Sequence, residues 1–159
     1  MFKRSGRLIA LVASALVVAG AATAANLLLP PRQTSDVAEP APDATPEQVV
    51  TVFLEALNAH DCGTAKAVVS ESAKESVWSW CERVAGLTSV DVGDHVTQRA
   101  EYSGRVAPEE VVYVPVEFDL SWRPLRTDGS MDEGPTTWGY LLVRDSPDSP
   151  WRIFDQGVG

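Results

Sequence analysis

Three residue types that often do chemistry stand side by side in the stretch LNAHDCGTA, residues 57–65. His60 is a candidate general base, because histidine titrates near neutral pH. Neighbouring helical residues point about 100° apart, so His60 and Asp61 cannot both project from one regular helix into the same cavity. We therefore favour structural roles, with His60 in the last turn of a first helix, where an imidazolium suits the helix dipole, and Asp61 as the N-cap of a second helix.

A second group of candidates lies in VDVGDHVTQRAEY, residues 90–102, which alternates apolar and polar positions as a strand does. If this strand is regular, Asp94 and Gln98 lie on its concave face with the valines, and His95 points the other way. Together with Phe53 from the first helix, they are candidates to line a ligand pocket, and Asp94 is a second candidate base. A bulge at Gly93 would instead turn Asp94 out to solvent.

The first residues of the chain predict export. Lys3, Arg4 and Arg7 precede a run from Leu8 to Leu29 that holds 22 residues and no charge. A helix of that length can cross a hydrocarbon core of roughly 30 Å. Residues 1–29 therefore act either as a membrane anchor, with a single pass and an extracytoplasmic domain, or as a signal peptide of a secreted protein.

Export gives meaning to the two cysteines of the chain, Cys62 and Cys81. An even pair in an exported domain predicts a disulfide, although two buried free thiols are the alternative. A disulfide sulfur is not a thiolate, so it serves neither as a nucleophile nor as a metal ligand. His60, Asp61 and Cys62 also lack the spacing that brings metal ligands together, and no nucleotide-binding motif is present. We expect no metal and no cofactor.

The net charge argues against nucleic acid as a partner. After the first seven residues, 10 of the 13 Lys and Arg remain against all 22 Asp and Glu, a formal balance of −12. Such a domain is repelled by phosphate backbones and by anionic membrane surfaces. The membrane contact that we expect is through the N-terminal segment alone.

Helices should come before strands in the folded part. Residues 30–46 hold five prolines and no aromatic residue, so we interpret residues 30–44 as an extended linker and residues 45–159 as the domain. Thr45 and Gln48 form a capping box for a first helix, and Asp61 caps a second that runs through residue 69. Ser72 and Glu75 form another capping box, which predicts a third helix ending near residue 84.

The rest of the chain reads as antiparallel strands. The strongest is VVYVPVEFDLSW, residues 111–122, whose alternate positions are apolar; Pro115 falls on its other face and suggests a bulge or an edge position. A loop with the turn signal Asp128-Gly129 follows, and then TWGYLLVR and WRIFD. The predicted class is α+β, with the helices packed on one face of the sheet. We expect five aromatic residues to pack in the core or on the sheet rather than to hold a cofactor: Tyr102, Tyr113, Trp122, Trp138 and Trp151.

This order resembles the nuclear transport factor 2-like superfamily, also called SnoaL-like or cystatin-like, whose members wrap a curved sheet around a long helix to form a cone. The likeness covers about residues 45–157 and rests on ALNAHDC at the end of the first helix and on WRIFDQG in the last strand. Asn58, Asp61 and Trp151 match positions that the family commonly uses. The chain is most similar to exported members found in actinobacterial cell envelopes.

The resemblance implies a pocket between sheet and helices, which some members use for catalysis and others only for binding or assembly. Our first hypothesis is a non-enzymatic, extracytoplasmic module that binds an envelope or membrane protein or a small apolar ligand. The open sheet face, with its Trp-bearing strands, also offers a surface for a homodimer. The alternative hypothesis is a small exported isomerase, cyclase or dehydratase, with Asp94 or His60 as the general base.

Overall fold

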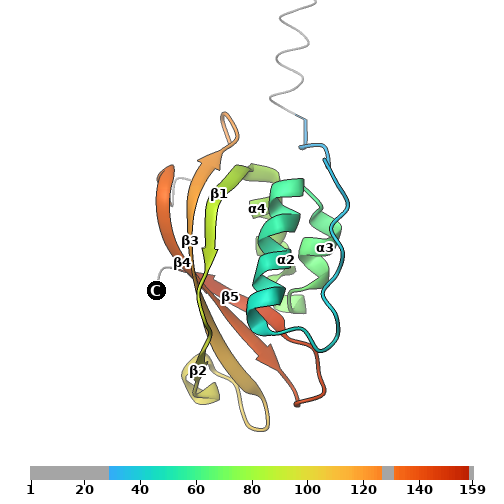
Figure 1. Ribbon diagram of the computed structural model, residues 1–159, viewed down its shortest axis with the longest axis vertical. Helices are drawn as coiled ribbons and strands as arrows, with labels where there is room; N and C mark the ends of the chain where they lie inside the picture. The colour runs from blue at the N-terminus through green and yellow to red at the C-terminus, as the bar shows by residue number, and fades with distance from the viewer. Residues whose placement is uncertain (1–28, 127–130, 158–159) are drawn as a thin grey trace, which may run out of the picture. The chain divides into compact units, whose positions relative to one another are not determined.

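The computed structural model describes residues 29–126 and 131–157, and in these ranges helices precede a curved, unclosed antiparallel sheet (Figure 1). In chain order the helices are α2 (Pro46–Ala59), α3 (Cys62–Ala67), η1 (Glu71–Ala73), α4 (Lys74–Arg83) and η2 (Ala100–Ser103), and η1 and η2 are 3-10 helices. The strands are β1 (Val84–Val92), β2 (Val96–Gln98), β3 (Glu110–Trp122), β4 (Gly134–Arg144) and β5 (Arg152–Gly157). The predicted α+β class is confirmed.

Two predictions fall outside these ranges. The apolar run of residues 1–29, apart from its last residue, and the Asp128-Gly129 turn are not among the described residues. Among residues 29–126 and 131–157, no helix is both long enough and apolar enough to span a membrane.

Helix α2 begins as its sequence predicts. Thr45 is the N-cap, and its hydroxyl accepts the Gln48 backbone N–H while the Gln48 side chain accepts the Thr45 N–H, which completes the capping box. Pro46 occupies the first turn, where a missing N–H costs nothing. The buried side chains of α2 pack on the concave face of the sheet, and the Phe53 ring meets the Tyr140 ring edge-on with 5.4 Å between centroids.

The next two helices differ from the prediction at their ends. α3 stops at Ala67, because the chain then pairs with β5: the Ile153 N–H donates to the Val68 carbonyl, and the Ser70 N–H donates to the Ile153 carbonyl. The predicted capping box at Ser72 and Glu75 is wrong. Ser72 lies inside η1, and α4 continues directly from η1 without a side-chain cap.

The centre of the sheet is β3, which pairs with β4 along one edge and with β1 and β2 along the other; β5 follows β4. The alternate residues of β3 that were predicted to share a face are all buried beneath the helices. Trp122 and Trp138 lie on this same side. Their ring centroids are 5.8 and 5.7 Å, respectively, from the centroid of the Trp80 ring. Trp151 is also buried. Trp122 and Trp151 therefore pack in the core, as expected, and Trp138 is partly buried against it.

The predicted long strand at residues 90–102 is interrupted. β1 ends at Val92, β2 covers only residues 96–98, and η2 follows, so that Tyr102 is 77% exposed rather than packed. Pro115 explains the gap: it lies in the middle of β3, neither at an edge nor at a bulge in the β3–β4 register, and it has no N–H to offer the neighbouring strand. Its carbonyl accepts the Gly93 N–H at 2.9 Å. A Cβ on Gly93 would approach the Pro115 ring to 3.0 Å, so this crossing favours glycine.

The proline-rich segment is not a free linker. Residues 31–44, which we call the strap, belong to the same compact unit as the rest of the described domain. In Figure 1 the strap runs along α2 and α3 on the side away from β1. The Thr34 N–H donates to the Ala59 carbonyl at 2.8 Å, and Val37 packs against the core. The folded unit therefore begins before the predicted boundary at residue 45.

Candidate functional site

The corner at residues 57–65 is a helix junction. His60 ends α2 in the left-handed conformation (φ 52°), which histidine adopts more readily than most residues, and its N–H donates to the Leu57 carbonyl at 3.1 Å. Burial, with the nearby positive charge of Arg123, lowers the pKa of His60. The expected imidazolium is therefore wrong, and the neutral ring is favoured. Among the described residues, its Nδ1 has no hydrogen-bond partner.

Asp61 caps α3, as predicted, and it also holds the strap. Its carboxylate accepts the Thr64 N–H at 3.1 Å, the Thr64 hydroxyl at 3.0 Å and the Val37 N–H at 3.0 Å. Because Asp61 is only 7% exposed, burial acts to raise its pKa. The hydrogen bonds, first of all the one from the Val37 N–H, outweigh burial and keep the pKa of Asp61 below its ordinary value. Asp61 is thus a structural carboxylate with its oxygens engaged.

The predicted disulfide between Cys62 and Cys81 is present, with 5.9 Å between the Cα atoms. It joins the first residue of α3 to the inner face of α4. Among the described residues, no group of three or more His, Cys, Asp and Glu side chains is arranged to hold a metal ion.

The three predicted pocket residues do not come together. Asp94 lies exposed in the connection between β1 and β2, where the interruption of the strand turns it outward. Gln98 is half-buried at the end of β2, opposite Val111 of β3. Phe53 belongs to α2, and its side chain is fully buried. Of the three, Phe53 lines the hollow described below and the other two do not.

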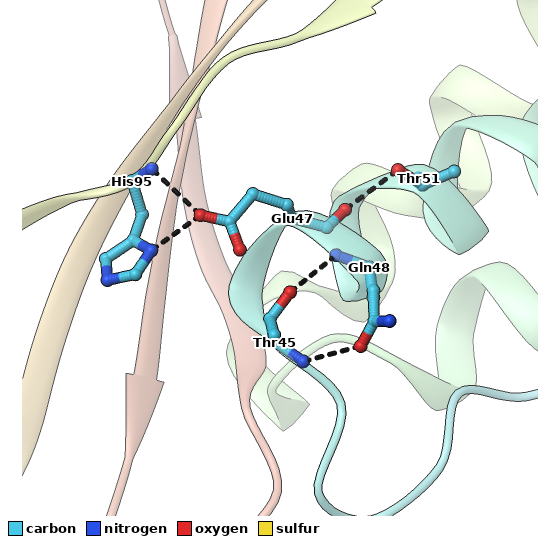
Figure 2. A network of polar contacts seen from close by, with 5 residues as sticks. All are labelled: Thr45, Glu47, Gln48, Thr51 and His95. Carbon is cyan, nitrogen blue, oxygen red and sulfur yellow. Dashed lines mark hydrogen bonds and ion pairs between the residues drawn. The ribbon is translucent and has the colours of Figure 1, made fainter.

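Glu47 and His95 form a polar pair that the sequence did not reveal, and it joins α2 to the connection between β1 and β2 (Figure 2). Glu47, in the first turn of α2, accepts the His95 backbone N–H at 2.9 Å and contacts the His95 ring Nδ1 at 2.5 Å. Partial burial alone would raise the pKa of Glu47, but hydrogen bonds from its own N–H and from His95 hold the pKa at about 2. The two residues are 48 positions apart, so no local pattern could have paired them.

A partly open hollow of about 140 Å³ lies between α2, η1, α4 and β5. Its walls are mostly apolar and include Phe53, Val77 and Ile153. Ser72 and Ser76 line the same hollow and are exposed residues, so they lie at its mouth. The arrangement suits a small apolar group with one polar end.

Asp155 and Gln156 supply polar groups of this hollow from β5, and Asp155 is exposed while Gln156 is half-buried. The contacts of Gln156 are the more unusual. Its Nε2 donates to the Ser76 hydroxyl at 3.3 Å, while its Oε1 is buried and has no hydrogen-bond partner among the described residues. Tyr140 stands directly opposite Gln156 on β4, and its buried hydroxyl likewise has no partner in the described part of the chain. Burial raises the pKa of Tyr140, so this hydroxyl stays protonated. Unsatisfied buried polar atoms are uncommon, and here two of them belong to one cross-strand pair.

Sequence reasoning did not identify this hollow. Serines one turn apart at Ser72 and Ser76 are an ordinary solvent-facing pattern, and a glutamine near the end of a strand carries no special signal. Only the packing of η1 and α4 over β5 brings them to one place.

Comparison with known proteins gives a family but no activity. No curated protein and no solved structure matches the chain. Residues 47–157 match the family described as a domain of unknown function, DUF4829, and this match spans α2 through β5. Since it covers most of the chain, the chain belongs to the DUF4829 family.

Proposed function

We propose that this chain is a non-enzymatic binding or assembly module outside the cytoplasm, held at the cell membrane by its N-terminal segment or secreted. The Cys62–Cys81 disulfide supports this location, because disulfides persist in oxidising compartments and are rare in the cytosol. The basic residues and uncharged run of residues 1–29 fit the same path.

The proposal includes a fold of the nuclear transport factor 2-like type. Its support is the order of the elements and the position of α2 against the concave side of a curved sheet (Figure 1). The three residues that carry the resemblance also have clear structural roles. Asp61 caps α3, Trp151 is buried just before β5, and the Asn58 side chain bonds the backbone of Leu87 in β1.

The observation that carries the binding function is the hollow between α2, α4 and β5. It is small, mostly apolar and edged by the Ser76–Gln156 hydrogen bond. A site of this kind holds either a small apolar ligand or one side chain of an envelope or membrane protein. A homodimer is a further form of assembly within this proposal.

The enzymatic alternative has less support. An isomerase, cyclase or dehydratase needs a general base within reach of its bound substrate. Neither Asp94 nor His60 lines the hollow. The polar side chains that line the hollow are two serines, an amide and the exposed carboxylate of Asp155, whose Oδ1 accepts the Gln156 N–H.

The test compares three forms of the full chain in the membranes of its own cells. Ser76→Phe fills the mouth of the hollow, and Glu75→Phe places the same ring on the neighbouring exposed position of α4. Chemical crosslinking should yield a discrete adduct for the wild type and for Glu75→Phe but not for Ser76→Phe. If the occupant is a small molecule, native mass spectrometry should detect it on the wild type and on Glu75→Phe but not on Ser76→Phe. Isolation of all three forms as bare monomers, with neither adduct nor bound molecule, would refute the proposal.

A further inference from the structure

We infer that the domain stands on the membrane with the end at which α2 finishes, and that Leu125 at this end contacts the lipid headgroups. This inference rests on the membrane-held form of the proposed function, and it specifies which end of the module is open to partners. It follows from the way in which the strap is docked and from the length of chain that precedes it.

The strap determines where the chain enters the domain. The Thr34 N–H and the Thr34 hydroxyl both donate to the carbonyl of Ala59, the last residue of α2, at 2.8 and 3.3 Å. The strap then runs back along α2, bonded through the Val37 N–H to Asp61, until Thr45 caps the first turn of the helix (Figure 1). The chain therefore enters at the C-terminal end of α2.

The chain before the strap is too short for another domain to lie between this end and the lipid. The apolar run ends at Leu29, five residues before Thr34. Fully extended, five residues span about 17 Å at most. If the run crosses a bilayer, the headgroup layer takes up about 5–8 Å of that length. The remaining 10 Å or so is no wider than a single helix.

The turn of residues 123–126, which follows β3, lies at the same end. The positive charge of Arg123 acts on His60, the residue that ends α2, and the Arg123 N–H donates to the Arg83 carbonyl at the end of α4. Leu125 is 85% exposed, more than any other large apolar side chain among the described residues. A leucine held at this distance from a bilayer transfers apolar surface from water to the headgroup boundary.

The charge of this end opposes the contact less than the charge of the whole domain does. The formal balance of −12 after the first seven residues predicts repulsion from anionic lipid. Around the 123–126 turn, however, the described residues include three cations and three acids, namely Arg83, Arg123, Arg126, Glu82, Asp132 and Glu133. The contact therefore depends on the tether and not on anionic lipid.

The opposite end faces away from the membrane. Glu47, in the first turn of α2, accepts the His95 N–H, so β2 and η2 lie at the N-terminal end of α2 (Figure 1). A helix of 14 residues is about 21 Å long. Tyr102 in η2, which is 77% exposed, is therefore farther from the lipid than Leu125. Partners reach the module from this side.

Quenching of a fluorophore by lipid compares the two ends. Leu125→Cys and Tyr102→Cys each receive one thiol-reactive fluorophore, because the native cysteines are joined in a disulfide and do not react. The two positions are matched in exposure. The full chain is placed in nanodiscs whose lipids carry a nitroxide on the headgroup. The label at residue 125 should lose most of its fluorescence in zwitterionic and in anionic lipid alike, and the label at residue 102 should keep its fluorescence.

A longer tether tests the role of the docked strap. About ten glycine and serine residues inserted between Pro30 and Pro31 add roughly 17 Å of flexible reach and leave the strap itself unchanged. The quenching at residue 125 should then fall, because the domain is free to leave the lipid surface. Quenching that the insertion does not change would overturn the role of the strap in holding this end at the membrane.

The remaining outcomes separate this inference from the proposed function. Equal quenching of the two labels, or stronger quenching at residue 102, would overturn the orientation while the binding function stands. Intact mass is measured on the same samples. Loss of residues 1–29 would show the secreted form and refute this inference, and the comparison of Ser76→Phe with Glu75→Phe would still decide the proposed function.

Discussion

A single carboxylate at Asp61 connects two parts of the chain that are distant in sequence. It accepts hydrogen bonds from Thr64, at the start of α3, and from Val37, in the strap. A carboxylate suits this role because it accepts several hydrogen bonds at once and offers no proton of its own. The apparent catalytic cluster of His60, Asp61 and Cys62 is thus a junction, with a helix end, a cap and a disulfide.

Removing this carboxylate should release the strap. Asp61→Ala leaves the Val37 N–H without its acceptor and removes the cap of α3, so we expect the free energy of unfolding to fall by about 2 kcal/mol or more. Amide hydrogen exchange at Val37 should accelerate at the same time. Asp43→Asn, at an exposed strap position, is the control and should change neither quantity. Unchanged exchange at Val37 in Asp61→Ala would contradict the role of Asp61.

Glu47 should make stability depend on acid. Its pKa in the folded protein is lowered from 4.5 to about 2. A carboxyl whose pKa is lowered on folding stabilises the protein above its unfolded pKa, and that contribution disappears as the pH falls through the folded pKa. We therefore expect the stability advantage of the wild type over Glu47→Gln to be complete above about pH 4.5 and to vanish toward about pH 2.

Urea unfolding at several pH values from 7 to about 2 measures this difference, with Glu75→Gln as an exposed control on α4. A difference between the wild type and Glu47→Gln that stays constant over the whole range would show that the His95 contact does not stabilise the folded state.

At the scale of single residues, local chemistry was predictable and distant pairing was not. The Thr45 capping box, the Asp61 cap and the disulfide were each deduced from residues whose chemistry permits few alternatives. The protonation of His60 was not, because it depends on burial and on Arg123, which comes close only in the folded chain. The Glu47–His95 pair was missed for the same reason.

Between elements, the free edge of β1 is closed by a side chain. The Asn58 amide donates to the Leu87 carbonyl at 2.8 Å and accepts the Leu87 N–H at 2.6 Å, as a neighbouring strand would. An unpaired strand edge invites pairing with other chains. Asn58 therefore joins α2 to β1 and at the same time protects the edge.

Replacing Asn58 should expose this edge. Asn58→Ala leaves both polar groups of Leu87 unpaired, and we expect the free energy of unfolding to fall by about 1–3 kcal/mol. Glu55→Ala, an exposed position earlier on α2, is the matched control and should be nearly neutral. Thermal unfolding gives the stability, and light scattering at rising concentration reports any new association. Equal behaviour of the two variants would rule out edge closure by Asn58.

Strand positions were predicted better than strand boundaries. The alternation in β3 identified the face buried beneath the helices, because a central strand turns every second residue toward them. It did not reveal that Val111, on the opposite face, is buried as well. The same alternation misled at residues 90–102, where Pro115 in the neighbouring strand breaks the pairing. A proline affects the strand beside it, and a one-dimensional pattern does not contain that neighbour.

For the whole domain, the disulfide is the main covalent constraint on the helices. Cys62 and Cys81 are 19 residues apart, and closing a loop of this length should contribute about 3 kcal/mol by restricting the unfolded chain. We expect the double variant Cys62→Ser, Cys81→Ser to unfold at lower urea concentration than the wild type, and reducing agent to lower the midpoint of the wild type only. A reductant effect on both proteins would show that it acts elsewhere.

The fold class could be deduced from the order of the helical and strand periodicities, but the hollow could not. Its lining comes from α2, η1, α4 and β5, which meet only after the chain has folded. The predicted pocket at Asp94 and Gln98 assumed an unbroken strand, and the interruption of that strand removed it.

The docked strap also changes where the folding unit should be cut. A recombinant fragment that begins at residue 47, where the family match starts, lacks the Thr45 cap of α2 and the Val37 N–H that Asp61 accepts. Such a fragment keeps every strand yet leaves a buried carboxylate short of a donor. A boundary drawn from sequence similarity and one drawn from hydrogen bonds thus differ by about fifteen residues. A fragment expressed from residue 31 keeps both the Thr45 cap and the bond from the Val37 N–H to Asp61.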